Sequence, residues 1–268
     1  MRLVVAGAGG RMGRMLVQAV AGAPGCRLVG AIERSGSDVL GGDAGLLAGI
    51  GPLGVPVTDE AARALTEADG VIDFTAPAAT LALGEAAAAR GLVHVVGTTG
   101  LSEADFAALR EHAGRSRIVQ SGNMSLGVNL MAALARKVAA VLGDEYDIEI
   151  VEMHHRAKVD APSGTALLLG EAAAAGRGVA LAERRVSTRD GHTGPRRAGD
   201  IGFATLRGGS VIGEHTVVFA GPAERLELTH RAEDRGLFAQ GAVRAALWAE
   251  SRPPGYYTMA DVLDLDAL

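Results

Sequence analysis

The chain is 268 residues long, 48% of them hydrophobic, and its formal net charge is −5 at pH 7. This length suits one large domain or two modest ones with a buried core. The acidic balance argues against a nucleic-acid partner or a DNA-binding regulator. Cys26 is the only cysteine, which excludes an intrachain disulfide and a cysteine-based zinc site, and the seven histidines show no HExxH spacing, so no metal is expected.

The amino-terminal segment shows no leader pattern. Arg2 runs directly into the apolar sequence LVVAGAGG, without a charged and then apolar stretch before it. We also expect no membrane-spanning segment, because no apolar run looks long enough to cross a bilayer. We therefore expect a cytoplasmic protein with no membrane partner.

The first half alternates short β-branched runs with Ala-rich stretches, which is typical of a parallel sheet with crossover helices. The expected strands are Arg2–Ala6, Arg27–Ile32, Gly70–Thr75, Val93–Gly97 and Arg117–Gln120. The expected helices are Gly10–Ala21, Glu60–Ala68, Ala78–Arg90 and Glu103–His112. The segment Gly41–Pro56 is so rich in glycine that we expect a mobile surface loop rather than a helix.

The pattern changes after Ser125. The expected elements are a helix at Leu126–Leu142, a strand at Asp147–Met153, a helix at Thr165–Ala175, strands at Gly202–Arg207, Ser210–Phe219 and Arg225–His230, and a helix at Gly236–Glu250. Short turns such as Gly208-Gly209 indicate antiparallel pairing of these later strands. The predicted class is α/β, a Rossmann-type parallel-sheet dinucleotide domain plus an α+β domain with a mixed sheet.

The turn after the first expected strand is rich in glycine. It consists of Gly7, Ala8, Gly9, Gly10, Arg11, Met12 and Gly13. A strand, a glycine-rich turn and a helix in this order let backbone N–H groups approach a pyrophosphate. The spacing is GxxGxxG rather than GxGxxG, because Met12 stands where the third glycine would be. The same residues also fit a simple tight turn.

Support for a nucleotide site comes from the end of the second expected strand. Glu33 lies twenty residues beyond Gly13, where an acid can bind the ribose 2′-hydroxyl of NAD. Arg34 beside it can pair with the 2′-phosphate of NADP, and Arg11 can lie over the same region. These residues predict a site that accepts both NADH and NADPH, with a solvated ion pair as the alternative.

Two polar loops follow the fourth and fifth expected strands. They are GTTG, Gly97–Gly100, and SGNMS, Ser121–Ser125. Ligands of open parallel sheets bind beyond the carboxyl ends of the strands. We therefore expect both loops at the nicotinamide end of the site, although each alone also fits turn and cap chemistry.

The segment Glu152–Ala166, EMHHRAKVDAPSGTA, is the most polar stretch of the second half. All but two of the 26 basic residues are Arg, and Lys158 is one of the two exceptions. The pKa of a lysine can be lowered enough for proton transfer and that of an arginine cannot, so Lys158 is a candidate acid as well as a possible surface amine. His154 and His155 close a strand, where neighbours point to opposite faces, so the pair offers one active-site group and one supporting group, although either alone also fits a core or surface histidine.

The end of this segment reads as a turn that feeds a helix. Ser163 is the expected N-cap, and the first free N–H groups come at Gly164 and Thr165. Such a helix start attracts carboxylates, although capping alone is the alternative. Together with Lys158 and the histidines, the segment predicts a pocket for an anionic substrate with an acid–base pair.

These motifs, in this order, resemble those of the 4-hydroxy-tetrahydrodipicolinate reductase (dihydrodipicolinate reductase) family. The resemblance rests on GxxGxxG, Glu33-Arg34, GTTG, SGNMSLGVN, HHRAKVDAPSGTA, TRDGHTG, IGFATLRGG, VIGEHTVVF, ERLELTHRA, FAQGAVRAALW and Tyr257-Thr258-Met259. It covers nearly the whole chain, and the HHRAKVDAPSGTA string is highly specific.

The resemblance implies a homotetramer that uses NADH or NADPH. Residues 1–125 and 236–268 would form the dinucleotide-binding domain, and residues 126–235 the substrate-binding and oligomerisation domain. His154 would be the catalytic acid or base and Lys158 the proton donor. The substrate carboxylates would be held by His155, Gly164 and Thr165, with Thr99 as a helper. The implied dinucleotide contacts are Gly7, Ala8, Gly9, Gly10, Arg11, Met12, Glu33, Arg34, Gly97, Thr98, Thr99, Ser121, Gly122, Asn123 and Met124.

The one visible departure from the family is the loop that carries SGNM, where many relatives have an Ala-Ala-Asn-Phe-like form. This leaves the nicotinamide packing at Met124 open. The predicted reaction is loss of water from 4-hydroxy-tetrahydrodipicolinate, a small dicarboxylate, and its reduction to tetrahydrodipicolinate in lysine and diaminopimelate biosynthesis. The alternatives are another two-domain oxidoreductase, similar to homoserine or aspartate dehydrogenase, and a non-catalytic NAD(P)H sensor.

Overall fold

The computed structural model of the protein describes residues 1–267, and the chain divides into two compact units. The first unit contains Met1–Ser125 and Arg235–Asp264, and the second contains Leu126–Asp234 and a short piece that begins at Leu265. The helix α9 (Gly236–Glu250) therefore returns the chain to the unit in which it began.

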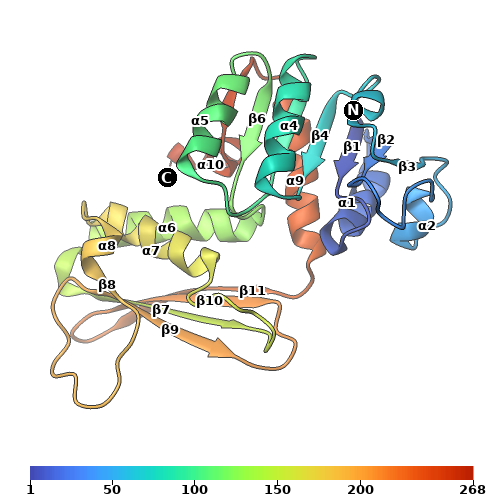
Figure 1. Ribbon diagram of the computed structural model, residues 1–268. Coiled ribbons are helices and arrows are strands. Elements are labelled where there is room, and N and C mark those ends of the chain that lie inside the picture. The colour runs from blue at the N-terminus through green and yellow to red at the C-terminus, as the bar shows by residue number, and fades with distance from the viewer. Residues whose placement is uncertain (268) are drawn as a thin grey trace. The chain divides into compact units, whose positions relative to one another are not determined.

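The first unit is built on a seven-stranded sheet in the order β12-β6-β5-β4-β1-β2-β3 (Figure 1). The strands are β1 (Arg2–Ala6), β2 (Arg27–Ile32), β3 (Val57–Thr58), β4 (Gly70–Asp73), β5 (Val93–Val96), β6 (Arg117–Gln120) and β12 (Gly255–Tyr257). Every neighbouring pair is parallel. All residues of β4 and β5 are buried, as expected for strands covered on both faces.

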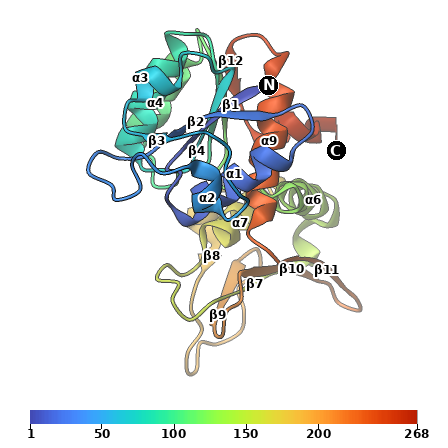
Figure 2. The same ribbon diagram turned by 90° about the vertical axis from the view of Figure 1, so that its right-hand side faces the viewer.

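Helices cover both faces of this sheet. They are α1 (Arg11–Gly22), α2 (Ala44–Ala48), α3 (Ala61–Ala64), α4 (Pro77–Ala88), α5 (Glu103–His112), α9 and α10 (Met259–Leu263). Figure 2 shows α4 on one side of the strands and α1 with α9 on the other. The start of α5 is set by its own sequence, since Ser102 and Asp105 form a capping box.

Two expectations about the first unit were incomplete or wrong. The five predicted strands are present, but β3 and β12 were missed because two or three residues carry no readable periodicity. The segment Gly41–Pro56 was expected to contain no helix, and it contains α2. The Asp43 carboxylate caps this helix by accepting the N–H groups of Gly45 and Leu46, and it also accepts those of Leu53 and Gly54. One side chain thus organises a glycine-rich segment that propensity assigns to loop.

The second unit contains a five-stranded mixed sheet in the order β11-β10-β7-β9-β8. Its elements are α6 (Leu126–Leu142), β7 (Asp147–His154), α7 (Gly164–Gly176), α8 (Leu181–Arg184), β8 (Arg185–Val186), β9 (Ile201–Arg207), β10 (Gly213–Ala220) and β11 (Arg225–Ala232). The helices α6 and α7 lie on one face (Figure 1), where Ile150, Leu169 and Phe219 belong to the buried core. Among the described residues of the second unit, no helix is seen on the other face in the same figure. The predicted fold class is confirmed for both units.

The strand order corrects one prediction. We expected β9 and β10 to form a hairpin across Gly208-Gly209, but β7 lies between them, parallel to β9 and antiparallel to β10. The connection from Arg207 to Gly213 therefore crosses the carboxyl end of β7. Three backbone hydrogen bonds tie this crossing to the end of β7: Gly208 N–H to His154 O, His155 N–H to Val211 O, and Arg156 N–H to Gly209 O. These hydrogen bonds hold the backbone of His154 and His155 against the connection between β9 and β10.

The apolar character of α6 was underestimated. Residues Leu126–Glu145 form a stretch of 20 residues with a mean hydropathy of 1.4, long and apolar enough to cross a membrane by length and composition alone. One such helix is weak evidence, and α6 packs against α7 and β11 within its unit.

Candidate active site

The glycine-rich turn of the first unit brings α1 unusually close to β1. Gly7 has a φ of +70°, and the N–H of Gly10 donates to the Gly7 carbonyl at 3.0 Å. A Cβ on Gly13 would lie 2.0 Å from the Gly7 oxygen, so no side chain fits there. This contact explains the GxxGxxG spacing, because the first turn of α1 rests directly on the strand end.

The Glu33 carboxylate is held at the edge of the same turn. Its Oε2 accepts the N–H of Gly9 at 3.0 Å, and its Oε1 accepts the N–H of Arg34 at 3.0 Å. The side chain of Arg34 is exposed. Gly10 is the N-cap of α1, and within the described chain no side chain accepts a hydrogen bond from the first N–H groups of the helix as a cap. The start of α1 is therefore open to a phosphate. The turn, the fixed carboxylate and the adjacent guanidinium fit a dinucleotide.

The GTTG loop after β5 is anchored by a buried polar cluster. Thr98 Oγ1 receives hydrogen bonds from the Thr80 hydroxyl at 2.8 Å and the Thr75 N–H at 3.0 Å, and it donates to Asp73. The Asp73 carboxylate is also 3.3 Å from the buried His94 ring. The Thr98 side chain is therefore engaged inside the unit, whereas Thr99 is exposed. Of the two threonines, only Thr99 presents its side chain at the surface.

The SGNM loop after β6 is folded on itself. The Ser121 hydroxyl donates to the Asn123 carbonyl, and the Asn123 side chain accepts the N–H of Ser125 at 2.8 Å. Met124 is only 1% exposed, and a Cβ on Gly241 of α9 would lie 1.8 Å from its carbonyl oxygen. The sequence did not reveal this burial, which makes Met124 a core residue of the unit and leaves Gly122 as the exposed part of the loop.

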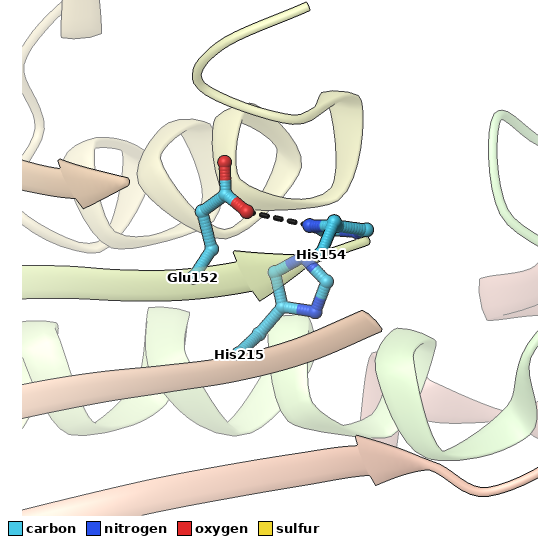
Figure 3. Close-up of side chains that lie close together, drawn as sticks. All are labelled: Glu152, His154 and His215. Atoms are coloured by element: carbon cyan, nitrogen blue, oxygen red, sulfur yellow. Dashed lines mark hydrogen bonds and ion pairs between the residues drawn. The ribbon is translucent and has the colours of Figure 1, made fainter. Parts of the chain in front are cut away.

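The main cluster of the second unit lies at the carboxyl end of β7 (Figure 3). Glu152 and His154 are two residues apart on one strand, so both point to the helix-covered face. The Nδ1 of His154 is 2.5 Å from Oε2 of Glu152, and both side chains are buried. Figure 3 also shows His215 of β10 beside them, and its ring meets that of His154 edge to face at 5.0 Å.

Glu152 is the centre of this cluster. The Arg207 guanidinium donates to both of its oxygens, at 2.8 and 2.9 Å, and the N–H of Ser163 donates at 3.0 Å. Burial alone would raise the pKa of Glu152, but the hydrogen bonds from Arg207, His154 and Ser163 outweigh it and hold that pKa below its usual value. Glu152 is therefore an ionised acceptor at neutral pH.

The two buried histidines are biased toward their neutral forms. Burial lowers the pKa of His154, and the nearby charges of Lys158 and Arg207 lower it further, against the opposing effect of Glu152. Burial, with the neighbouring His154, lowers the pKa of His215 to about 3. The Nε2 of His215 is 3.0 Å from the Ser163 hydroxyl, which also caps α7 by accepting the N–H of Ala166.

Lys158 lies in the loop between β7 and α7. Its Nζ is paired with Asp160 at 2.8 Å, and its backbone N–H donates to the His155 carbonyl. Lys158 lowers the pKa of Asp160 through this hydrogen bond. Ser163 is the N-cap of α7, as expected, so Gly164 and Thr165 stand in its first turn. The structure thus brings together His154, Lys158 and the helix start.

The ligand atoms of Glu152, His154 and His215 lie within 4.8 Å of one another, which is close enough for one metal ion to contact all three. The chemistry of the cluster does not favour this use. Both Glu152 oxygens already accept hydrogen bonds from Arg207, and an ionised Glu152 requires a proton on the His154 nitrogen nearest to it. A cation would have to displace a guanidinium, so we interpret the group as a hydrogen-bond network.

Glu152, Arg207 and His215 were not among the predicted site residues. Strand alternation alone could have placed Glu152 on the same face as His154. No local signal points to Arg207 or His215, which lie 55 and 63 positions beyond Glu152 and reach it only through the strand order β10-β7-β9.

Comparisons with known proteins give a consistent result. The family model described as "Dihydrodipicolinate reductase, N-terminus" matches residues 1–124, and the corresponding C-terminal model matches residues 127–263. A curated 4-hydroxy-tetrahydrodipicolinate reductase from Afipia carboxidovorans is 64% identical over 265 residues, covering 99% of this chain and 97% of the relative. One from Sinorhizobium medicae is 61% identical over 267 residues, covering 99% and 98%.

Solved structures show the same fold at lower identity. A dipicolinate-bound dihydrodipicolinate reductase from Paenisporosarcina sp. TG-14 superposes with a TM-score of 0.73 at 22% identity, covering 96% of this chain and 97% of that one. An amine dehydrogenase from Mycobacterium smegmatis superposes with a TM-score of 0.60 at 17% identity, covering 96% and 94%.

Proposed function

The chain belongs to the dihydrodipicolinate reductase family, and we propose that its two units divide the reaction into a dinucleotide site and a substrate site. The protein is an NAD(P)H-dependent oxidoreductase of lysine and diaminopimelate biosynthesis that reduces 4-hydroxy-tetrahydrodipicolinate. The observation that carries the division of labour is the His154–Glu152 network beside the start of α7, within a unit separate from the glycine-rich turn.

The first unit is proposed to hold NADH or NADPH. The backbone of Gly7–Met12 would face the pyrophosphate, and Glu33 would accept the ribose hydroxyls, for which it is already oriented by the N–H groups of Gly9 and Arg34. Arg34 would pair with the 2′-phosphate of NADPH. The loops at Gly97–Thr99 and Ser121–Met124 would flank the nicotinamide, with contacts from the Thr98 and Met124 backbones because their side chains are buried. The bound nicotinamide supplies a hydride.

The second unit is proposed to hold the dicarboxylate. The first turn of α7, at Gly164 and Thr165, offers backbone N–H groups and the positive end of a helix dipole to one carboxylate. His155, with Thr99 as a helper, would contact the substrate as well. These residues would fix the ring for hydride transfer, and such orientation is a large part of many rate enhancements.

Lys158 and His154 are proposed to move the protons of the reaction. Hydride addition to the ring conjugated with the imine leaves negative charge toward the ring nitrogen, which must be protonated. Lys158 carries the only amine of the network, and His154 carries an imidazole whose Nδ1 is engaged with Glu152. General acid–base catalysis by a positioned group contributes roughly 10²–10⁴-fold in rate.

A coupled assay tests this function. The unstable substrate is generated with its upstream synthase, and the absorbances of NADH and NADPH are followed separately. The proposal predicts synthase-dependent oxidation of both reduced nucleotides. Nucleotide binding without turnover would instead support a sensor, and oxidation of homoserine or aspartate would support a dehydrogenase.

We further propose that the protein is a cytoplasmic homotetramer assembled through the helix-free face of the second sheet. Apolar side chains on that face support this, because Val151, Met153 and Val218 point away from the α6–α7 core and Leu206 is 50% exposed. Light scattering of the purified protein would then give four times the 27.3 kDa chain mass. A charge on the face, Val151→Glu, should lower the mass, whereas Val141→Glu, at an exposed position of α6, should not.

A further inference from the structure

The Glu152–His154 contact suggests that one residue of the second unit's site positions another. We propose that Glu152, held by Arg207, is a positioning residue that keeps the His154 proton on Nδ1 and presents Nε2 to the substrate. This inference rests on the role of His154 in the proposed function, and it assigns to Glu152 and Arg207 a part that the functional comparisons do not.

The first step of the argument is the hydrogen-bond inventory of Glu152. An ionised carboxylate has no proton to give, so at 2.5 Å the His154 Nδ1 must be the donor. Because Arg207 donates to both carboxylate oxygens, Glu152 stays ionised and cannot rotate without losing two charge-assisted hydrogen bonds. The imidazole is fixed both in orientation and in tautomer.

The second step concerns the other ring nitrogen of His154. A Cβ on Gly213 would lie 3.0 Å from Nε2, so the absence of a side chain at this position leaves space beside that atom. The charged groups that act on the imidazole are Glu152 on β7, Arg207 on β9 and Lys158 in the following loop, and the His215 ring of β10 contacts it edge to face. Glu152 is the only anion among them, so its removal would leave the imidazole among cations and a neutral ring.

The third step is the support of Arg207 itself. Its guanidinium also donates to the Asp160 carbonyl at 2.7 Å. Asp160 carries the carboxylate that pairs with Lys158. Arg207 therefore connects the Glu152–His154 pair to the loop that carries Lys158. The two groups proposed to transfer protons are held by the same guanidinium.

Nitrogen-15 NMR of histidine-labelled full-length protein tests the proposal without turnover. The His154 resonances are assigned by their loss in His154→Gln. The expected result at neutral pH is a protonated Nδ1 and an unprotonated Nε2 in the wild type. A wild-type proton on Nε2 would overturn the proposal.

The kinetics of Glu152→Gln distinguish a positioning role of Glu152 from a purely structural one. Loss of an orienting carboxylate costs about 10⁴-fold in kcat in the Ser-His-Asp enzymes, and we expect a loss of at least roughly 10²-fold here with little change in KM for NADH. The acidic limb of the pH–rate profile should move to lower pH, because the anion that raises the pKa of His154 is gone. Unchanged kcat and profile would overturn the proposal.

Glu149→Gln and His154→Gln serve as the comparison variants for these kinetics. Glu149→Gln is the matched control, since Glu149 lies on the same strand and also pairs with two arginines, Arg189 and Arg196, but faces the other side of the sheet. It should keep the wild-type kcat, and an equal loss there would overturn the proposal. Full turnover in His154→Gln would instead overturn the proposed role of His154, whatever the NMR result.

Discussion

Gly213 lies against the imidazole of His154, and a Cβ at this position would sit 3.0 Å from Nε2 and 3.4 Å from Cδ2. The two residues are on neighbouring strands, β10 and β7, whose pairing brings residues 59 positions apart into contact. This proximity makes Gly213 a sensitive probe of the atom proposed to exchange a proton.

Gly213→Ala should lower kcat by at least roughly tenfold, because a displacement of about 1 Å in a catalytic group can cost 10²-fold. Steady-state kinetics with the coupled assay measures the effect, and urea denaturation checks that the fold is retained. Gly208→Ala is the control, since its Cβ would meet only the flexible end of Met153 at 3.3 Å. Wild-type kcat in Gly213→Ala would show that the space beside Nε2 is not used.

Lys158→Ala should lower turnover by roughly 10²–10⁴-fold while the affinity for NADH stays near normal, because the amine is proposed to donate a proton and not to hold the nucleotide. Turnover and fluorescence titration with NADH provide the two measurements. The chain supplies its own control in Lys137→Ala, which removes the only other lysine, exposed on α6. If Lys158→Ala and His154→Ala both kept near-wild-type turnover, the acid assignment would be wrong.

Arg34→Ala should weaken NADPH more than NADH, because the exposed guanidinium is proposed to pair with the 2′-phosphate that only NADPH carries. Dissociation constants for both nucleotides measure the ratio. Arg27→Ala, at the opposite end of β2, should leave both affinities unchanged. Equal losses for the two nucleotides in Arg34→Ala would reject the 2′-phosphate role.

Gly13→Ala should destabilise the first unit, because its Cβ would lie 2.0 Å from the Gly7 carbonyl and α1 would have to move off the strand. Overpacking of this kind typically costs about 1–3 kcal/mol. The free energy of unfolding in urea measures it, with Gly22→Ala as a control because nothing lies within 4 Å of a Cβ there. Equal stability of the two variants would contradict the close approach.

Low pH should lower the stability of the second unit, because His215 is buried in its neutral form. Its pKa is lowered to about 3 in the folded protein, so between the unfolded value near 6.5 and that pKa the unfolded chain binds the extra proton. Stability should fall as pH falls through this window, by up to about 1.4 kcal/mol per pH unit. Urea midpoints at pH 7 and pH 5 measure the slope. His215→Gln should have a shallower slope than the wild type, and identical slopes would contradict the assignment.

Features set by a few adjacent residues could be predicted from the chain alone. The Ser102–Asp105 capping box, the Ser163 N-cap and the left-handed Gly143 at the end of α6 each depend on neighbours within a turn. The positions of five strands of the first sheet could also be predicted, because strands covered on both faces form short, mainly apolar runs in the sequence.

Features set by pairing between distant segments could not be predicted in this way. The three-residue strand β12 exists because Gly255–Tyr257 lies along Arg117–Val119, 138 positions earlier. In the same way, β7 comes between β9 and β10 although the link between those two strands is short enough for a hairpin.

The amino-acid sequence was sufficient for the class of each unit, the nucleotide turn and the His154–Lys158 segment, because periodicity, glycine spacing and caps are local properties of the backbone. Strand order alone brings Arg207 and His215 to Glu152, and Arg207 keeps Glu152 an ionised acceptor for the proton on His154 Nδ1. A tautomer is chosen by the partner that a ring nitrogen meets, and the charge of that partner is known only once the sheet has assembled.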